Sequence, residues 1–214
     1  AFRPDSVTAE VPWQPGEERR AEYYFACDPC FPIGDFEGAA AKGVKYRNFP
    51  AYAYATQAAI VEVDKSTGHT KVLKFIAAHD VGRAINPHII EGQMHGSCSM
   101  GQGYALTEGF PTKDGYPVKK TYRELGLPRA EDTPDYELIL IEDPEPQGPY
   151  GAKGISEVAT VPATPAILNA VSNAIGVRIN KVPASPEVVL EAIRTGRCDV
   201  PTMDEMIAQL NTQD

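Results

Sequence analysis

The residues with the clearest chemical potential lie in a glycine-rich loop that ends in a carboxylate. Gly148, Gly151 and Gly154 recur at three-residue spacing and are followed by Ser156 and Glu157. Glycine is needed where the backbone takes a positive φ or approaches another group closely, so this spacing suggests a loop whose amides line a ligand. A carboxylate at the start of the next helix would face unpaired amides, which favour anions. Glu157 is therefore a candidate general base, and an ordinary surface turn is the alternative.

A second candidate is an amide on a helix that we predict to start after Pro87 and to run to about Glu108. Gln93 on this helix offers two hydrogen-bond donors and an acceptor. Glycine inside a helix costs roughly 0.5–1 kcal/mol relative to alanine, so several glycines need a reason. Either close packing of another backbone or the approach of a flat cofactor would supply it. The small residues that share one helix face are Gly92, Gly96, Ser99 and Gly103.

Other combinations of reactive residues carry less weight. Glu91, His95 and Cys98 have the i, i+4, i+7 spacing of zinc ligands on a helix. No fourth ligand accompanies them, so we predict no metal held by side chains. Cys27 and Cys30 have the spacing of half a zinc site or a redox pair, but the other half is missing and ordinary loop cysteines are the favoured interpretation. The sequence has no four-cysteine iron–sulfur spacing.

Composition and charge exclude several classes of protein. The 214 residues, 43% hydrophobic and 23% charged, are typical of a globular domain with an ample core. A net charge of -9 without a basic stripe argues against nucleic acids and acidic membranes as partners. We find no apolar run near the roughly 20 residues of a membrane span. Four cysteines do not form a secreted disulfide framework, so we expect a cytoplasmic protein. The first residue is not Met, and we expect a piece of a longer protein.

The loop and the helix need a scaffold, and the sequence predicts an α+β fold with mixed or antiparallel strands and packed helices. Strand-like residues at 51–64 and 71–78, joined by a turn, predict a β-hairpin. A further strand is predicted at 136–141. Two helices are predicted after the loop, one from Thr164 with a stop at Gly176 and one from Pro186 to Gly196.

The remaining segments have weaker patterns. Short strands are predicted at 21–26 and 178–179, and a capping box at 202–205 predicts a last helix. Residues 109–135 are mostly polar and are predicted to be a loop with partial structure. We divide the chain into an extended arm and loop at 1–45, packed on a partner, and a domain at 46–214.

Four stretches resemble, in the same order, the C-terminal molybdopterin-binding region of the molybdenum hydroxylases, the xanthine dehydrogenase and aldehyde oxidase family. They lie between about Tyr46 and Arg194 and read DVGRAINP at 80–87, EGQ to Gly103 at 91–103, GAKGISE at 151–157 and VPASP at 182–186. The family motif before the acid reads roughly G-x-K-G-x-G-E, so Ser156 stands where glycine is usual. A serine there suits either of two roles, capping the next helix or touching the cofactor.

The resemblance implies the C-terminal half of a molybdenum-cofactor-binding domain of the xanthine dehydrogenase type. It also implies an oxidoreductase that hydroxylates a C–H of an N-heterocycle or an aldehyde with water. Glu157 would take the proton from a molybdenum-bound hydroxide, and Gln93 would hydrogen-bond the cofactor. Further cofactor contacts, mainly through the backbone, would come from Gly151, Ala152, Lys153, Gly154 and Ser156.

The resemblance further implies cofactors and partners that this chain does not itself contain. The cofactor would be molybdopterin, either alone or as a dinucleotide, with Fe–S clusters and FAD on other domains or chains. The partners would be the N-terminal half of the molybdenum subunit, an Fe–S subunit, an FAD subunit and a small-molecule substrate. The chain would then hold half of an active site. A non-catalytic assembly or interface module with the same fold is the alternative, and the presence of both Glu157 and Gln93 favours the enzyme.

Overall fold

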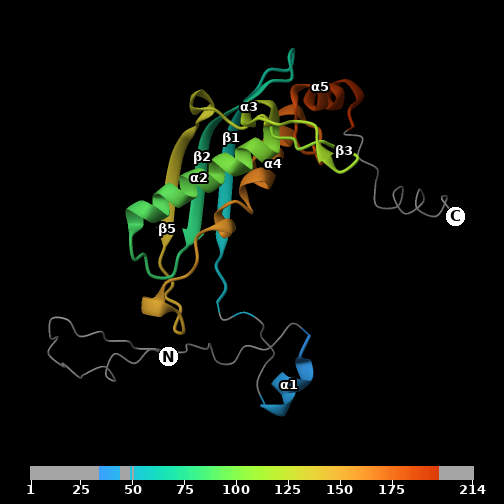
Figure 1. Ribbon diagram of the computed structural model, residues 1–214. Coiled ribbons are helices and arrows are strands. Elements are labelled where there is room, and N and C mark those ends of the chain that lie inside the picture. Colours follow the sequence, from blue (N-terminus) through green and yellow to red (C-terminus); the bar gives the residue numbers. More distant parts are fainter. Residues whose placement is uncertain (1–33, 44–48, 50, 198–214) are drawn as a thin grey trace, which may run out of the picture.

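The structure is a computed structural model that describes residues 34–43, 49 and 51–197. Its largest sheet has three strands in the order β1-β2-β5 (Figure 1). β1 (Ala55–Val63) runs antiparallel to β2 (Thr70–Asp80), and β5 (Asp135–Ile141) runs parallel to β2. The hairpin and the later strand are confirmed, and the combination of a mixed sheet with helices is the predicted α+β fold.

The first strand of the hairpin packs on the core with every second residue, and the residues between them face the opposite side of the sheet. Ala59 and Val61 are partly buried against the core, whereas Ile60 between them is 49% exposed. The connecting turn needs a glycine at Gly68, which has φ +75°. A Cβ at that position would lie 2.2 Å from the carbonyl oxygen of Pro186, so the turn and the later helix approach each other at the backbone.

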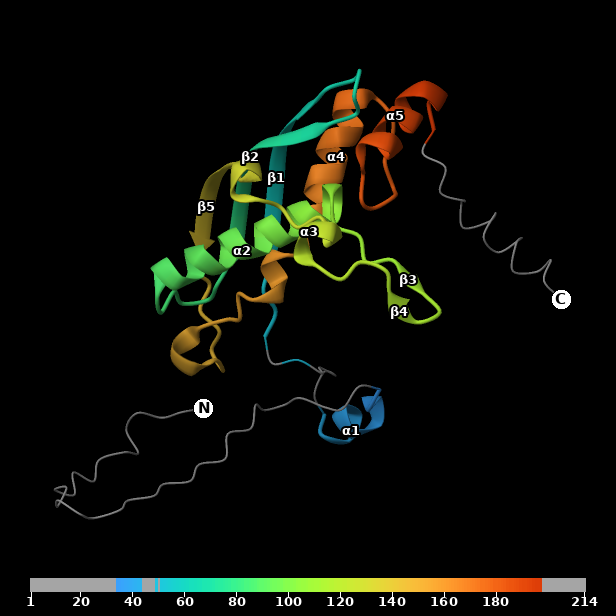
Figure 2. The same ribbon diagram turned by 45° about the horizontal axis from the view of Figure 1, so that its top comes forward.

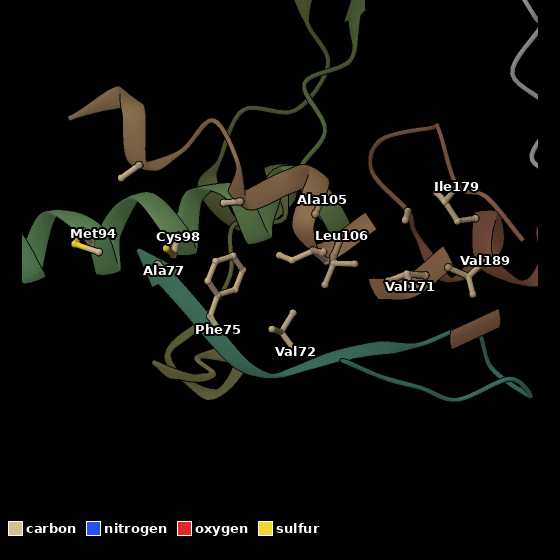
Figure 3. Close-up of a cluster of buried hydrophobic side chains, with 14 of the residues drawn as sticks. Val72, Phe75, Ala77, Met94, Cys98, Ala105, Leu106, Val171, Ile179 and Val189 are labelled. Atoms are coloured by element: carbon tan, nitrogen blue, oxygen red, sulfur yellow. The ribbon is translucent and has the colours of Figure 1, made fainter. Parts of the chain in front are cut away.

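Two helices, α2 (Pro87–Leu106) and α4 (Ala163–Ile175), cover the same face of the sheet (Figures 1 and 2). Figure 3 shows Phe75 projecting from β2 toward the helices, with Cys98 on α2 beside it. α5 (Pro186–Thr195) extends this core. Burying each large side chain contributes about 1.5–3 kcal/mol. The largest apolar side chains that are at least 98% buried are Val72, Phe75, Val81, Met94, Cys98, Ile167, Val171 and Val189.

The helices begin and end near the predicted positions because local sequence caps them. The side chain of Asn86 accepts a hydrogen bond from the amide of Ile89 at 3.2 Å, which starts α2 directly before Pro87. α4 and α5 end at Gly176 and Gly196, both in the left-handed conformation that glycine adopts at helix ends. α2 ends two residues before the predicted Glu108, and α4 begins one residue before the predicted Thr164.

Shorter elements occupy the connections between the main strands and helices. The stretch predicted as a partly structured loop, 109–135, contains β3 (Thr112–Lys113), β4 (Tyr116–Pro117), α3 (Tyr122–Leu125) and the 3-10 turn η2 (Ala130–Asp132). The others are α1 (Phe36–Ala41) and the 3-10 turns η3 (Pro149–Gly151) and η4 (Glu157–Ala159).

Two local predictions are wrong. Residues 178–179 form no strand, because Ile179 is buried and its amide donates to the hydroxyl of Ser172 at 2.8 Å. Glu157 does not open the next long helix either, because η4 and a turn separate it from α4. The predicted strand at 21–26, the capping box at 202–205 and the Cys27–Cys30 pair lie outside the described residues. The division of the chain at residues 45 and 46 stays a prediction.

The second face of the sheet is apolar and open. Both views place the long helices on the other side of the sheet (Figures 1 and 2). On the open face, Ile60 of β1 and Ile139 and Ile141 of β5 are 43–49% exposed. An ion pair between Lys74 and Glu137, 2.6 Å apart, lies among them. We call this surface the open sheet face.

One segment, Glu157–Ile175, is long and apolar enough by length and composition to cross a membrane, which was not expected from the sequence. It joins η4 to α4. Ala163, Ile167 and Val171 of α4 are fully buried in the hydrophobic core. A packed core helix passes the same test, and that is the role α4 has in this fold.

Candidate functional site

A small pocket between α2 and η4 contains both leading candidate residues. Gln93 comes from α2 and Glu157 from η4, which are far apart in the sequence. The pocket has a volume of about 210 Å³. The fold thus brings Gln93, Ser156 and Glu157 together. The full lining is shared between the two elements and their flanks: Gly92, Gln93, Gly96, Ser97, Met100, Ser156, Glu157 and Thr160.

The wall on α2 is open because two glycines leave it without side chains. A Cβ at Gly92 or Gly96 would meet no atom within 4 Å. The two residues are four positions apart and therefore lie on the same side of the helix. Met94 and Cys98, on the opposite side, are fully buried in the core. α2 is thus anchored on one side and leaves room on the other for a flat group to reach its backbone.

The glycines farther along α2 have a different reason. A Cβ at Gly101 would lie 2.3 Å from the Cβ of Ala163, and one at Gly103 would lie 2.9 Å from the ring of Pro128. The sequence left two explanations open for the helix glycines, backbone packing and an approaching cofactor. Close packing accounts for Gly101, against Ala163, and for Gly103, against the Glu108 side chain and Pro128, whereas Gly92 and Gly96 face open space.

Glu157 is the first residue of η4, and its carboxylate is free to act. The side chain is exposed and has no ion-pair or hydrogen-bond partner among the described residues. The preceding carbonyl, of Ser156, accepts a hydrogen bond from the Ser97 hydroxyl of α2 at 3.4 Å. The Ser156 side chain caps no helix, so of its two suggested roles the cofactor contact remains, as a prediction. Gln93 is likewise exposed, and its amide has no partner in the described part of the chain.

The glycine-rich loop folds back onto the end of β2. The amide of Lys153 donates to the Val81 carbonyl at 3.0 Å, and the amides of Gly151 and Ala152 donate within the loop. These three N–H groups therefore already have partners within the protein. Cofactor contacts by this loop stay a prediction, which depends most on Gly154, where a Cβ would meet nothing within 4 Å.

The loop meets the DVGR stretch backbone to backbone at Gly82. This residue has φ +62°, and a Cβ there would lie 2.4 Å from the Gly151 carbonyl oxygen. The amide of Arg83 donates to the same oxygen at 2.8 Å. Glycine is required because it alone allows both this conformation and this approach. Two of the motifs singled out in the sequence are therefore one structural unit.

A buried ion pair also links the glycine-rich loop to the DVGR stretch. The ammonium of Lys153 lies 2.6 Å from Asp80 and 3.1 Å from Asp143, and the Lys153 and Asp80 side chains are 5% and 6% exposed. Burial by itself would raise the pKa of the Asp80 carboxyl, but hydrogen bonds from Lys153 and from the Gly82 amide outweigh it and hold the pKa below its ordinary value. The hydrogen bond to Asp80 raises the pKa of Lys153. Both groups are therefore charged at neutral pH.

A second buried contact links η4 to the sheet. Nε2 of Gln57 on β1 donates to the carbonyl of Ala159 at 2.8 Å and to Nε2 of His79 at 2.7 Å. His79 is fully buried, and burial lowers its pKa, so the imidazole is neutral at pH 7. Because Nε2 accepts, the ring proton is on Nδ1, which has no partner within the described residues.

The metal site considered on α2 does not form among the described residues. His95 contacts the ring of Tyr136 at a centroid distance of 4.7 Å, whereas Cys98 is fully buried in the core. Burial raises the pKa of the Cys98 thiol to about 12. No group of three potential metal ligands exists in the parts of the chain that the structure describes.

Sequence reasoning found the two groups that face the pocket and missed the contacts behind them. Asp80 carried a usable signal, because an acid two residues before a glycine at the end of a strand is suited to accept from that glycine's amide in a turn. Gln57 and His79 carried none, since a polar residue in a strand usually faces solvent.

Comparison with known proteins identifies related chains. The family model of the molybdopterin cofactor-binding domain matches residues 15–134. A protein of Bacillus subtilis (strain 168), described as a probable subunit of xanthine dehydrogenase, is 38% identical over 142 residues, which are 66% of this chain and 19% of that protein. An aldehyde oxidoreductase of Megalodesulfovibrio gigas is 37% identical over 147 residues, or 68% of this chain and 16% of that protein.

Solved structures agree with the sequence matches. The crystal structure of quinoline 2-oxidoreductase from Pseudomonas putida 86 superposes with a TM-score of 0.63 and 37% identity, over 67% of this chain and 19% of that chain. The chain therefore spans about a fifth of the length of the relatives it matches. The family model covers Gln93 and stops before Glu157.

Proposed function

Because the chain belongs to the molybdopterin cofactor-binding domain family of molybdenum hydroxylases, we propose that it supplies one wall of the active site of such an enzyme. The proposed reaction hydroxylates a C–H bond of an N-heterocycle or an aldehyde with oxygen from water. Electrons would pass to Fe–S clusters and FAD on other domains or chains. The relatives include a probable xanthine dehydrogenase, an aldehyde oxidoreductase and a quinoline oxidoreductase, which are the reason for this substrate class.

The observation that supports this proposal most directly is the pocket shared by Gln93 and Glu157. The residues present fit a pterin cofactor in shape and in chemistry. Gly92 and Gly96 open a flat strip of helix backbone, and Gln93 beside them has a free amide with donors and an acceptor. A carboxylate faces the same space from η4. The pocket is small because this chain provides only part of the surrounding protein.

In this proposal the protein's own residues bind and orient the cofactor, and one of them accepts a proton. Molybdopterin supplies the redox chemistry when it is bound, as cofactors generally carry the difficult step. Gln93 orients the cofactor through hydrogen bonds along the glycine strip of α2. Glu157 accepts a proton during the reaction, a role for which a carboxylate must be anionic, close and rigidly held. Ser156 and Gly154 contact the cofactor on the η4 side.

We further propose that the rest of a molybdenum subunit covers the open sheet face. Three isoleucine side chains exposed by 43–49% on one sheet face form the kind of apolar surface that marks an interaction site. The matched stretch is only 19% of these relatives, so they contain ample further sequence to cover it. An Fe–S subunit and an FAD subunit would complete the assembly, with residues 1–45 as an arm on a partner.

The decisive experiment is Glu157→Gln in the assembled enzyme. The amide keeps the size of the side chain but cannot take a proton, so we expect turnover to fall by about 10²–10⁴-fold with the molybdenum content unchanged. Glu91→Gln is the matched control, because Glu91 is an exposed carboxylate on α2 outside the pocket lining. Wild-type turnover in Glu157→Gln would instead support a non-catalytic assembly module with the same fold.

A further inference from the structure

The segment that carries Glu157 is attached to the sheet on both sides of this residue. Lys153 fixes its beginning and Ala159 fixes its end. The two attachments converge on Asp80 and His79, which are consecutive residues at the end of β2. Consecutive strand residues face opposite sides of a sheet, so each of the two can hold a different part of the chain.

In the first attachment both carboxylate oxygens of Asp80 accept hydrogen bonds. One carboxylate oxygen accepts from the Gly82 amide at 3.0 Å, and the other accepts from the Lys153 ammonium at 2.6 Å. The backbone of Lys153 is held too, by its bond to the Val81 carbonyl. Position 153 therefore cannot move without breaking a buried, charge-assisted bond.

The second attachment acts from the opposite side of β2. The imidazole of His79 accepts from Gln57 and so fixes the amide that donates to the Ala159 carbonyl. Ala159 ends η4, which Glu157 begins. A buried amide that is already oriented holds that carbonyl in one place.

We propose that Asp80 and His79 are positioning residues which, through Lys153 and Gln57, set the place of Glu157 in the pocket. This inference depends on the proposed function, because it concerns the reach of the same carboxylate. Between the two attachments, the bond from Ser97 to the Ser156 carbonyl is long, at 3.4 Å. The two ends therefore decide where the carboxylate stands, and a displacement of about 1 Å in a reacting group can cost 10²-fold in rate.

Hydrogen exchange on the full chain tests the attachment without any cofactor. Lys153→Met keeps the apolar stem and removes the charge, and Gln57→Leu keeps the size and removes the amide. We expect each to raise exchange of the hydrogen-bonded amides at the ends of the segment, those of Lys153, Ala159 and Thr160, by about tenfold or more, with β1 and β2 unchanged. Lys74→Met is the control, since Lys74 lies on β2, as Asp80 does, but its ion pair is away from this segment.

Unchanged exchange of these three amides in both variants would overturn the inference. If Lys153→Met does not fold, Gln57→Leu decides by the same criterion, because it removes no charge.

Turnover of the assembled enzyme separates positioning from mere stability. We expect Lys153→Met to lower kcat per bound molybdenum by about 10–100-fold with KM unchanged, and Lys153→Arg to restore most of it. If Glu157→Gln abolishes turnover while Lys153→Met keeps the wild-type kcat per bound molybdenum, the positioning inference fails and the proposed function stands. If Glu157→Gln leaves turnover intact, the proposed function fails, and the inference fails with it.

Discussion

The two ends of α2 contain the same kind of residue for opposite reasons. Toward its N-terminus, Gly92 and Gly96 face open space beside Gln93 and Glu157. At its C-terminal end, Gly101 and Gly103 are buried where α4 and a loop approach the helix. We call these the open end and the packed end. In the sequence they form a single series of glycines spaced along one helix.

The comparison shows that the absence of a side chain can serve packing or binding, and that the neighbour decides which. At the packed end a missing Cβ is filled by another part of the protein. At the open end nothing described fills it, which is the expected state of a wall that a cofactor would cover. Substitutions along one helix should therefore have effects of different size and sign.

The largest expected effect is the difference in unfolding free energy between alanine variants of two methionines on α2. Met94 is fully buried, whereas Met100 is 43% exposed and lines the pocket. Met94→Ala should lower the free energy of unfolding by about 2–5 kcal/mol, because it leaves a cavity in the core. Met100→Ala should stay within about 0.5 kcal/mol. Urea unfolding of both variants measures this, and equal losses would mean that α2 has no open side.

The next effect concerns the packed end. In Gly101→Ala the new methyl group would lie 2.3 Å from the Cβ of Ala163, so α2 and α4 would have to move apart. Overpacking typically costs about 1–3 kcal/mol, which exceeds the roughly 0.5–1 kcal/mol that alanine adds to a helix. We expect a net loss in the free energy of unfolding. The double variant Gly101→Ala/Ala163→Gly moves the methyl across the contact and should recover part of the loss.

A smaller effect of opposite sign is expected at the open end. Gly96→Ala should raise the free energy of unfolding by about 0.5–1 kcal/mol, because alanine is the better helix former and meets no neighbour there. The same methyl group would stand in the proposed cofactor wall, so the assembled enzyme should contain less molybdenum. A variant that is more stable and also fully loaded with molybdenum would remove the open end from the site.

The smallest expected effect is a pH dependence that distinguishes the Asp80–Lys153 ion pair from the packed end of α2. The folded pKa of Asp80 lies below its ordinary value of 3.8, so the stability it contributes is complete above about pH 4 and is lost as pH falls through the folded pKa. The difference in unfolding free energy between the wild type and Asp80→Asn should therefore be constant between about pH 5 and 9 and shrink in stronger acid. Gly101→Ala changes no charge, and its loss should not depend on pH. Denaturant titrations at three pH values test both statements.

Much of the scaffold could be predicted because it is specified by neighbouring residues. The strand-like residues on both sides of a turn that contains Gly68 predict the β-hairpin, and Pro87 predicts the start of α2. Gly176 and Gly196 likewise mark the helix ends at which they were placed. Gln93 and Glu157 were recognised as candidates because their motifs are contiguous. Each of these signals lies within a few residues of the feature that it predicts.

What the sequence could not supply is the identity of each distant neighbour. Lys153 looked like part of a ligand loop, and the fold turns its ammonium toward Asp80. Gln57 carries no signal in the sequence, and the fold places its amide against the Ala159 carbonyl. The reason is physical: backbone propensity and periodicity act over one or two turns of chain, whereas burial, ion pairing and close backbone contact depend on which segments the folded chain brings together. The sequence by itself determined most of the elements and the candidate chemistry, and the tertiary structure decided which glycines pack, which face open space and which contacts hold the segment on both sides of Glu157.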